Sequence, residues 1–157
     1  MKKIYITTPI FYVNDLPHIG HAYTSIICDT IYKYFKLDGF DVLFTTGTDE
    51  HGLKVEKAAN KKEMDVGDFV DLVSKNFKVL PKKLQLSNTD FIRTTESRHK
   101  NAALYFWDEL VKNDQIYLSK YKGWYSIKDE SFYQEKELEK KNNEFYTSDG
   151  DKVEWIE

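Results

Sequence analysis

The chain has 157 residues, of which 41% are hydrophobic and 31% are charged, and its formal net charge is −3. This length fits one domain, or one domain and the start of another, and the hydrophobic content excludes a disordered chain. The charge balance excludes an overall basic surface for nucleic acid. With a single cysteine, Cys28, the chain can form neither an internal disulfide nor a cysteine-cluster metal site. Polar residues interrupt the first apolar run too early for a signal peptide or a membrane helix, so we expect a cytoplasmic protein without a membrane segment.

The amino-terminal part predicts a strand, a long helix and a second strand. Residues 4–8 are β-branched and aromatic, which favours a buried strand. Pro17 suits the first position of a helix, apolar residues recur at helical spacing over residues 19–35, and Gly39 supplies a left-handed stop. Residues 42–46 predict a second short strand. Strand, helix and strand within about 45 residues indicate a βαβ unit whose two strands are parallel.

Further helices and a third strand follow. Helical patterns cover residues 53–62 and a stretch that begins at Asp65, which is a suitable N-terminal cap. Residues 90–93 predict the third strand, and another helix opens near residue 95. The apolar side chains that we expect the last two helices to bury are Val66, Phe69, Val70, Val73, Phe77, Leu80, Leu84, Ala103, Phe106, Trp107, Leu110 and Val111. These elements predict an α/β fold built on a parallel sheet.

The pattern changes at about residue 116, because aromatic residues then recur in short runs that are separated by charged residues and glycines. Such runs are typical of small antiparallel strands. We place a domain boundary near residues 113–115, which gives one domain over residues 1–115 and a β-rich one over residues 116–157. The aromatic side chains of the second part are interpreted as the core of its small sheets and not as a platform for stacking bases.

His18, Gly20 and His21 lie where the first strand and its loop turn into the long helix. A helix N-terminus has unpaired backbone N–H groups and a partial positive charge, so it favours an anion such as phosphate. Histidines three residues apart project from the same face of a helix, and the glycine lets a ligand approach the backbone. We interpret them as a nucleotide phosphate site in which both imidazoles stabilise a transition state. The alternative is one exposed histidine and one in the core.

Residues 47–52, Gly-Thr-Asp-Glu-His-Gly, follow the second strand. Parallel sheets bind ligands at the carboxyl ends of their strands, and a carboxylate there can hold an ammonium group. Asp49 is therefore a candidate binding residue, unless Asp49 or Glu50 merely caps the next helix. The apolar loop before the long helix, with Ile10 and Tyr12, would line a side-chain pocket or belong to the core.

Several motifs resemble the class I aminoacyl-tRNA synthetases. Ile-Thr-Thr-Pro-Ile-Phe-Tyr-Val-Asn at residues 6–14 and Pro-His-Ile-Gly-His-Ala-Tyr at residues 17–23 are similar to the amino-terminal catalytic signature of that class. The motif at residues 47–52 narrows the resemblance to the methionyl-tRNA synthetases. Residues 91–96 and 123–125 are also similar to that family, and the resemblance is strongest in the first domain.

The resemblance implies the first half of a Rossmann-like parallel sheet with flanking helices, followed by the start of a small β-rich connective insertion. It implies activation of methionine with ATP and Mg²⁺ to methionyl-adenylate, and then transfer to tRNA(Met). His18 and His21 would be catalytic and would bind ATP together with Gly20. Asp49 would hold the methionine amino group. Ile10 and Tyr12 would contact the methionine side chain.

The chain departs from the family in two respects. Ser126 and Asp129 stand where many members have the first of the zinc-binding cysteine pairs, so we expect no zinc and no other bound metal. The lysine-bearing signature loop, the second half of the nucleotide fold and the anticodon-binding helices are absent from the sequence. We therefore expect a fragment with little activity of its own, in which tRNA(Met) binds mainly through parts that this chain lacks.

Two other functions remain open at this point. A non-catalytic module could keep the fold and bind nucleotides weakly. A small nucleotidyltransferase with a similar histidine-rich turn would have no methionine pocket, and Tyr12 and Asp49 would then be incidental.

Overall fold

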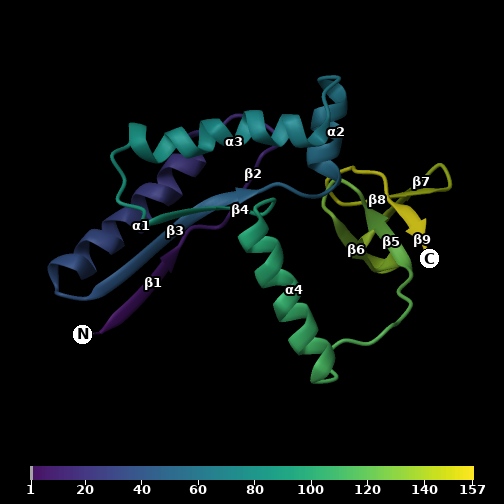
Figure 1. The fold of residues 1–157 in the computed structure, drawn as a ribbon. Coiled ribbons are helices and arrows are strands. Elements are labelled where there is room, and N and C mark those ends of the chain that lie inside the picture. Colours follow the sequence, from purple (N-terminus) through teal and green to yellow (C-terminus); the bar gives the residue numbers. More distant parts are fainter. Residues whose placement is uncertain (1) are drawn as a thin grey trace. The chain divides into compact units, whose positions relative to one another are not determined.

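The computed structural model describes residues 2–157, and Figure 1 shows the order of the elements along the chain. The chain divides into two compact units, Met1–Asp108 and Glu109–Glu157. The first contains the parallel sheet, and the second contains the small β-rich part. In the part of the chain that the structure describes, no helix is both long and apolar enough to cross a membrane.

The first unit contains a four-stranded parallel sheet with β3 (Asp41–Asp49) at its centre. β1 (Lys3–Thr7) and β2 (Phe11–Tyr12) pair along one edge of β3, and β4 (Asp90–Arg93) pairs along the other. All of these pairings are parallel, which confirms the predicted α/β fold. The carboxyl ends of the strands therefore point toward the same end of the sheet.

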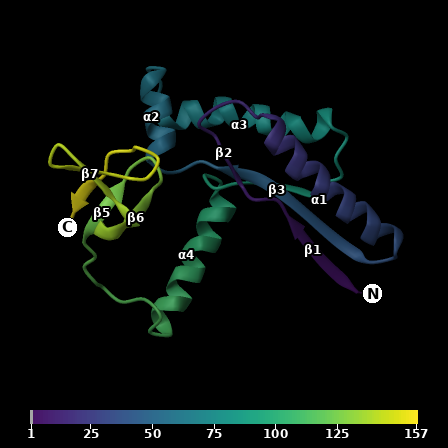
Figure 2. The same cartoon turned by 180° about the vertical axis from the view of Figure 1, so that it is seen from behind.

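Helices connect these strands. α1 (Ile19–Leu37) connects β2 to β3, while α2 (Leu53–Lys61) and α3 (Val66–Lys83) lie between β3 and β4 in the sequence. In Figures 1 and 2, α1 and α3 lie on the same side of the sheet. α3 begins where predicted, because the Asp65 side chain accepts hydrogen bonds from two amides of the first turn at 2.8 and 3.3 Å.

The core of the first unit lies between these helices and the sheet. Tyr32 of α1 packs on Phe44 of β3, and Phe77 of α3 packs on Phe11 of β2, with ring centroids 6.0 Å apart in both pairs. The buried cluster that includes the last pair consists of Phe11, Val13, Val55, Ala59, Phe69, Val70, Val73 and Phe77. The core therefore joins the amino-terminal loop to α2 and α3.

The two faces of β3 differ in their surroundings. Side chains alternate between the faces of a strand, so Phe44 and Thr48 share the face that the helices cover, here called the helix-covered face. Leu43 and Asp49 belong to the opposite face. There, Leu43 is 50% exposed and its register partner Tyr5 is 62% exposed. The apolar core is thus built on the helix-covered face.

Two element boundaries differ from the prediction. α1 begins at Ile19 with His18 as its N-cap, so Pro17 lies before the helix and not at its first position. β3 continues past Gly47, which pairs with Ile92 of β4. An ideal Cβ on Gly47 would lie 2.1 Å from the carbonyl oxygen of Ile92. The glycine therefore allows β4 to approach, and it does not end the strand.

Two helices bury less apolar surface than their spacing indicates. The buried residues of α1 are Ser25 and Asp29, and its apolar stripe is largely exposed. Asp29 accepts the amide of Ser87 at 2.6 Å and pairs with Lys33, also at 2.6 Å. α4 (Ser97–Lys112) has no buried residue in the described structure, so the predicted burial of its apolar side chains is wrong. Helical spacing identifies an apolar face, but it does not show whether another element covers that face.

The second unit is built from short antiparallel strands, as predicted. They are β5 (Gly123–Ser126), β6 (Ser131–Tyr133), β7 (Glu139–Lys141), β8 (Glu144–Tyr146) and β9 (Glu154–Ile156). β5 lies between β6 and β9 in a three-stranded sheet, and β7 pairs with β8. A 3₁₀ turn, η1 (Glu135–Glu137), follows β6. Trp124 packs against Phe145 and Trp155 at 4.3 and 5.3 Å between ring centroids, which joins the two small sheets.

Replacing Gly47 with alanine should destabilise the chain strongly, because the new methyl group would force β4 away from β3. We expect a loss of about 3 kcal/mol in the free energy of unfolding, at the upper end for overpacked sites. Gly39→Ala is the matched control, since Gly39 has a φ of 81° but open space around it, and it should cost only about 1–2 kcal/mol. Urea denaturation of both variants checks this. Equal losses would show that β4 does not need the glycine.

Candidate active site

The two histidines of the predicted phosphate site cap α1 with their side chains. The Nδ1 atom of His18, the N-cap residue, accepts a hydrogen bond from the Gly20 amide at 3.1 Å. The Nδ1 atom of His21 accepts the amide of His18 at 3.0 Å. The rings lie side by side, with centroids 3.9 Å apart and planes inclined by 33°. Each imidazole therefore uses one nitrogen to satisfy the helix end.

This reciprocal cap determines which nitrogen of each neutral ring carries the proton. Because Nδ1 accepts a hydrogen bond in both rings, the proton lies on Nε2. We predicted unpaired backbone amides at this helix end, but the amides of His18 and Gly20 already donate to the rings. The two Nε2–H groups are donors that an anion could use, next to the positive end of the helix dipole.

Gly20 lies beneath the ring of His18. An ideal Cβ at this position would lie 2.9 Å from Cε1 and 3.1 Å from Nδ1 of that ring. We expected the glycine to admit a ligand to the backbone. The structure adds a second reason, because the absence of a side chain lets the His18 ring fold over the first turn of α1.

His21 rests on two phenylalanines of the core. Its ring meets Phe11 and Phe77 edge to face, with centroid distances of 4.7 and 5.1 Å. Burial lowers the pKa of His21 below its ordinary value of 6.5, and electrostatic repulsion from the His18 ring in its protonated form lowers it further. A lowered pKa favours the neutral ring, and only the neutral ring can accept the His18 amide at Nδ1.

Tyr12 and Asp49 are brought together by strand pairing. They are register partners in the parallel β2–β3 pair, so both side chains belong to the opposite face of the sheet. Tyr12 is 38% exposed, and the Lys54 ammonium lies 5.7 Å from the centroid of its ring. Ile10, the third residue of the predicted methionine site, lies just before β2 and is also exposed. Tyr12 and Asp49 thus lie side by side at the carboxyl end of β3.

Sequence reasoning missed a buried ion pair next to this group. The side chain of Glu50 is 0% exposed and accepts two hydrogen bonds from Arg93, at 2.7 and 2.9 Å. The alternative in which Asp49 or Glu50 caps the next helix is wrong, because the N-cap of α2 is Gly52, with a φ of 100° and no side-chain cap. The available signal was that Glu50 follows the strand predicted at residues 42–46 and that Arg93 ends the strand predicted at residues 90–93.

In the second unit, Ser126 and Asp129 form hydrogen bonds with each other. They stand where the resemblance places a cysteine pair in other members of the family. The buried Ser126 hydroxyl donates to the Asp129 carboxylate at 2.8 Å and accepts the Asp129 amide at 3.1 Å. Tyr133 donates to the same carboxylate at 2.9 Å. Within the described residues, no group of three or more His, Cys, Asp and Glu side chains could hold a metal ion. Hydrogen bonds thus close this turn.

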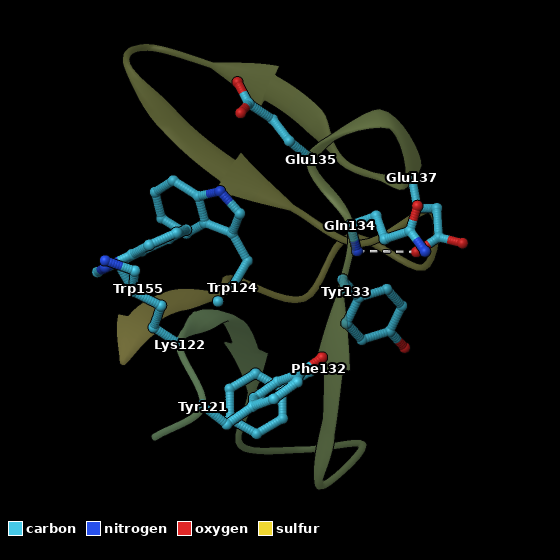
Figure 3. A pocket seen from close by; sticks show the side chains of 10 residues that line it. Tyr121, Lys122, Trp124, Phe132, Tyr133, Gln134, Glu135, Glu137 and Trp155 are labelled. Carbon is cyan, nitrogen blue, oxygen red and sulfur yellow. Dashed lines mark hydrogen bonds between the residues drawn. The ribbon is translucent and has the colours of Figure 1, made fainter. Parts of the chain in front are cut away.

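Figure 3 shows a hollow in the second unit that is lined by β5, β6, η1 and β9. Phe132 meets Tyr121 edge to face, with a centroid distance of 4.6 Å. Tyr121 is 70% exposed and Trp155 is 52% exposed, so the prediction that these aromatic residues form a core holds for Trp124 but not for all of them. Lys122, Glu135 and Glu137 supply charged groups of both signs to the lining of the hollow.

Comparison with known proteins identifies the family. The family described as "tRNA synthetases class I (M)" matches residues 4–155. The chain belongs to the methionyl-tRNA synthetase family. The methionine–tRNA ligase of Rickettsia felis is 53% identical over 152 residues, and that of Listeria monocytogenes is 44% identical over the same length. Methionyl-tRNA synthetase from Mycobacterium tuberculosis, solved in complex with methionyl-adenylate, superimposes with a TM-score of 0.90 at 40% identity.

The chain spans less than a third of these relatives. The matches cover 97% of the chain but 29% of the Rickettsia felis protein and 22% of the Listeria monocytogenes protein. The structural match covers 99% of the chain and 31% of the Mycobacterium tuberculosis protein. The similarity therefore extends over nearly the whole chain but covers only part of the longer synthetases.

The reciprocal cap should respond to acid. Because the fold lowers the pKa of His21, its neutral form contributes stability above a pH of about 6.5, and this contribution is lost as the pH falls through the lowered value. We expect NMR titration of the imidazole resonances to give a His21 pKa below 6.5, with the His18 amide signal shifting in the same transition. In His18→Asn, which removes the neighbouring charge, the pKa of His21 should rise part of the way. A His21 pKa above 6.5 would contradict this account.

Proposed function

We propose that residues 1–157 carry the part of a methionyl-tRNA synthetase active site that binds the phosphates of ATP and the amino acid. The reciprocal cap of His18 and His21 carries this proposal, because it presents two Nε2–H donors side by side at a helix N-terminus. The family assignment and the relative solved with methionyl-adenylate support it. The substrates are ATP and methionine, and tRNA(Met) is the acceptor that the ligase name of the relatives indicates.

The first reaction is attack of a methionine carboxylate oxygen on the α-phosphorus of ATP. The new P–O bond gives methionyl-adenylate, and the bond to the departing pyrophosphate breaks with its electron pair on the leaving oxygen. Negative charge on the phosphate oxygens is stabilised by preorganised donors, which is the role of the two histidines. Neither histidine needs to act as a base, because an ionised carboxylate has no proton to lose. Mg²⁺ would enter with the ATP phosphates as part of the substrate.

Methionine binds at Asp49, Tyr12 and Ile10. The carboxylate of Asp49 accepts a charge-assisted hydrogen bond from the methionine ammonium. Tyr12 and Ile10 offer apolar surface to the thioether side chain, and sulfur makes favourable contacts with aromatic rings. A small nucleotidyltransferase would not need this group, so the pairing of Tyr12 with Asp49 favours the synthetase. We further propose that residues 1–115 form the first half of the nucleotide-binding domain, that residues 116–157 belong to the connective insertion, and that the protein works in the cytoplasm.

Asparagine at the two histidine positions separates capping from catalysis. Asparagine is a good N-cap, so His18→Asn should keep the melting temperature while removing one Nε2–H donor. In the complete protein that carries these residues, we expect methionine-dependent ATP–pyrophosphate exchange to fall by about 100-fold or more, as for the loss of an oxyanion donor. The same loss is expected for His21→Asn. Unchanged single-turnover adenylation in both variants would exclude the phosphate role.

Asp49→Asn tests the amino-acid half of the site in the same protein. The variant keeps the shape of the side chain but removes its charge, so methionine binding should weaken by about 10- to 100-fold, while ATP binding stays unchanged. Isothermal titration with each substrate measures both affinities. Equal methionine affinity in the variant and the parent protein would favour the nucleotidyltransferase alternative.

We also propose that the second unit folds without zinc, because hydrogen bonds already close the turn at Ser126 and Asp129. Chelators unfold small domains that depend on zinc. Here, EDTA should leave the thermal melting curve unchanged, and added zinc should not raise the melting temperature. A lower melting temperature in EDTA that zinc restores would contradict the proposal.

A further inference from the structure

The proposed mechanism gives no role to the buried charge of Glu50. The side chain of Glu50 is fully buried, and burying a carboxylate is costly unless it is paired and hydrogen-bonded. Both requirements are met here. Arg93 donates from Nε and Nη2 at 2.7 and 2.9 Å, and the hydroxyls of Thr48 and Thr95 donate at 2.6 and 2.5 Å. These four hydrogen bonds to one carboxylate at the end of a strand indicate that Glu50 holds the neighbouring chain in a defined position.

The backbone around Glu50 is joined to the end of β4 in the same way. The Glu50 amide donates to the Thr94 hydroxyl at 2.8 Å, and the Thr94 amide donates to the Thr48 carbonyl at 3.2 Å. The ring of His51 lies within 3.3 Å of the Thr94 carbonyl oxygen. These bonds continue the β3–β4 connection beyond the register pair of Thr48 and Arg93. The chain segment on both sides of Asp49 is therefore fixed to β4.

Asp49 lies between these anchored positions, and its own partner is on the other edge of β3. There it pairs with Tyr12 of β2. Because successive side chains of an extended chain point to opposite faces, an anchored Glu50 on the helix-covered face directs Asp49 to the opposite face. Arg93 neutralises the buried charge of Glu50, whereas the carboxylate of Asp49 belongs to the opposite face of the sheet.

We propose that Glu50 and Arg93 are positioning residues for amino-acid binding: their buried ion pair holds the carboxylate of Asp49 in the orientation that grips the ammonium group of the substrate. The inference rests on the proposed function and extends it to residues that do not touch the substrate. It predicts that substituting either Glu50 or Arg93 weakens the contact between Asp49 and the substrate ammonium group but leaves the other substrate contacts unchanged.

The structure supplies a matched control on the same guanidinium. Asp71 of α3 also accepts a hydrogen bond from Arg93, at 2.6 Å, but its side chain is 62% exposed. Exposed ion pairs contribute little, so Asp71→Asn should leave substrate binding unchanged. Glu50→Gln keeps the volume of the buried side chain and removes its charge. Arg93→Lys keeps the positive charge and removes the two-pronged contact.

The experiment compares two ligands of the complete protein, L-methionine and its analogue without the amino group, 4-(methylthio)butanoate. Glu50→Gln and Arg93→Lys should each weaken methionine binding by about 10- to 100-fold, the range for a charge-assisted contact that is lost or misaligned. Binding of the analogue, which has no ammonium, should not change between the parent protein and either variant. Affinities for ATP should also remain unchanged, and melting curves report whether each variant is folded.

The outcomes separate the two proposals. Equal weakening of methionine and the analogue in a folded variant would mean that the ion pair only supports the fold, and the positioning role would be overturned. If methionine affinity is unchanged in Glu50→Gln or Arg93→Lys but falls in Asp49→Asn, the positioning role is also overturned, while the proposed function stands. If the parent protein binds ATP but not methionine, the proposed function falls and this inference falls with it. Should Glu50→Gln fail to fold, the affinities of Arg93→Lys decide between these outcomes.

Discussion

The two-sided pairing of β3 is the constraint on which the rest of the site depends. β3 pairs with β2 on one edge and β4 on the other, and each pairing delivers side chains to its carboxyl end. β2 places Tyr12 beside Asp49, and β4 places Arg93 beneath Glu50. Gly47 makes the second pairing possible, because any larger residue would collide with the backbone of β4. A central parallel strand with polar residues at its end is where α/β sheets bind ligands, and here both neighbours contribute to that end.

Polar groups at this end of the sheet are held in place before any ligand arrives. The histidines of α1 bond to the helix end, and the buried carboxylate of Glu50 has four side-chain hydrogen bonds. Preorganised donors and charges stabilise a transition state without the cost of reorienting during the reaction. The same bonds also satisfy groups that would otherwise destabilise the fold. In the proposed site, the hydrogen bonds that stabilise the fold would therefore also preorganise the groups that bind the substrates.

Local features of the sequence predicted much of this structure. The predicted strands β1, β3 and β4, the cap at Asp65 and the βαβ connection depend on residues close together in the chain, and all of them are present. β2 was not predicted, and β1 is partly exposed where a buried strand was expected. Features that depend on distant residues could not be predicted. The pairing of Glu50 with Arg93 joins positions 43 residues apart, and it requires the register of β3 and β4. Likewise, the spacing in α1 and α4 showed an apolar face, but burial depends on what packs against it.

A single extra residue between β1 and β2 connects the two halves of the proposed site. Thr7 pairs with Thr45, yet Phe11 pairs with Thr48, so four steps along one strand match three along the other. If the register continued one-to-one from Thr7, Tyr12 would lie opposite Glu50 and would face the core, because a shift of one residue moves every side chain to the other face. Because the extra residue is left unmatched, Phe11 supports the ring of His21 while Tyr12 lies beside Asp49. The proposed phosphate donors and the proposed ammonium acceptor are thus linked to adjacent residues of one short strand, Phe11 and Tyr12.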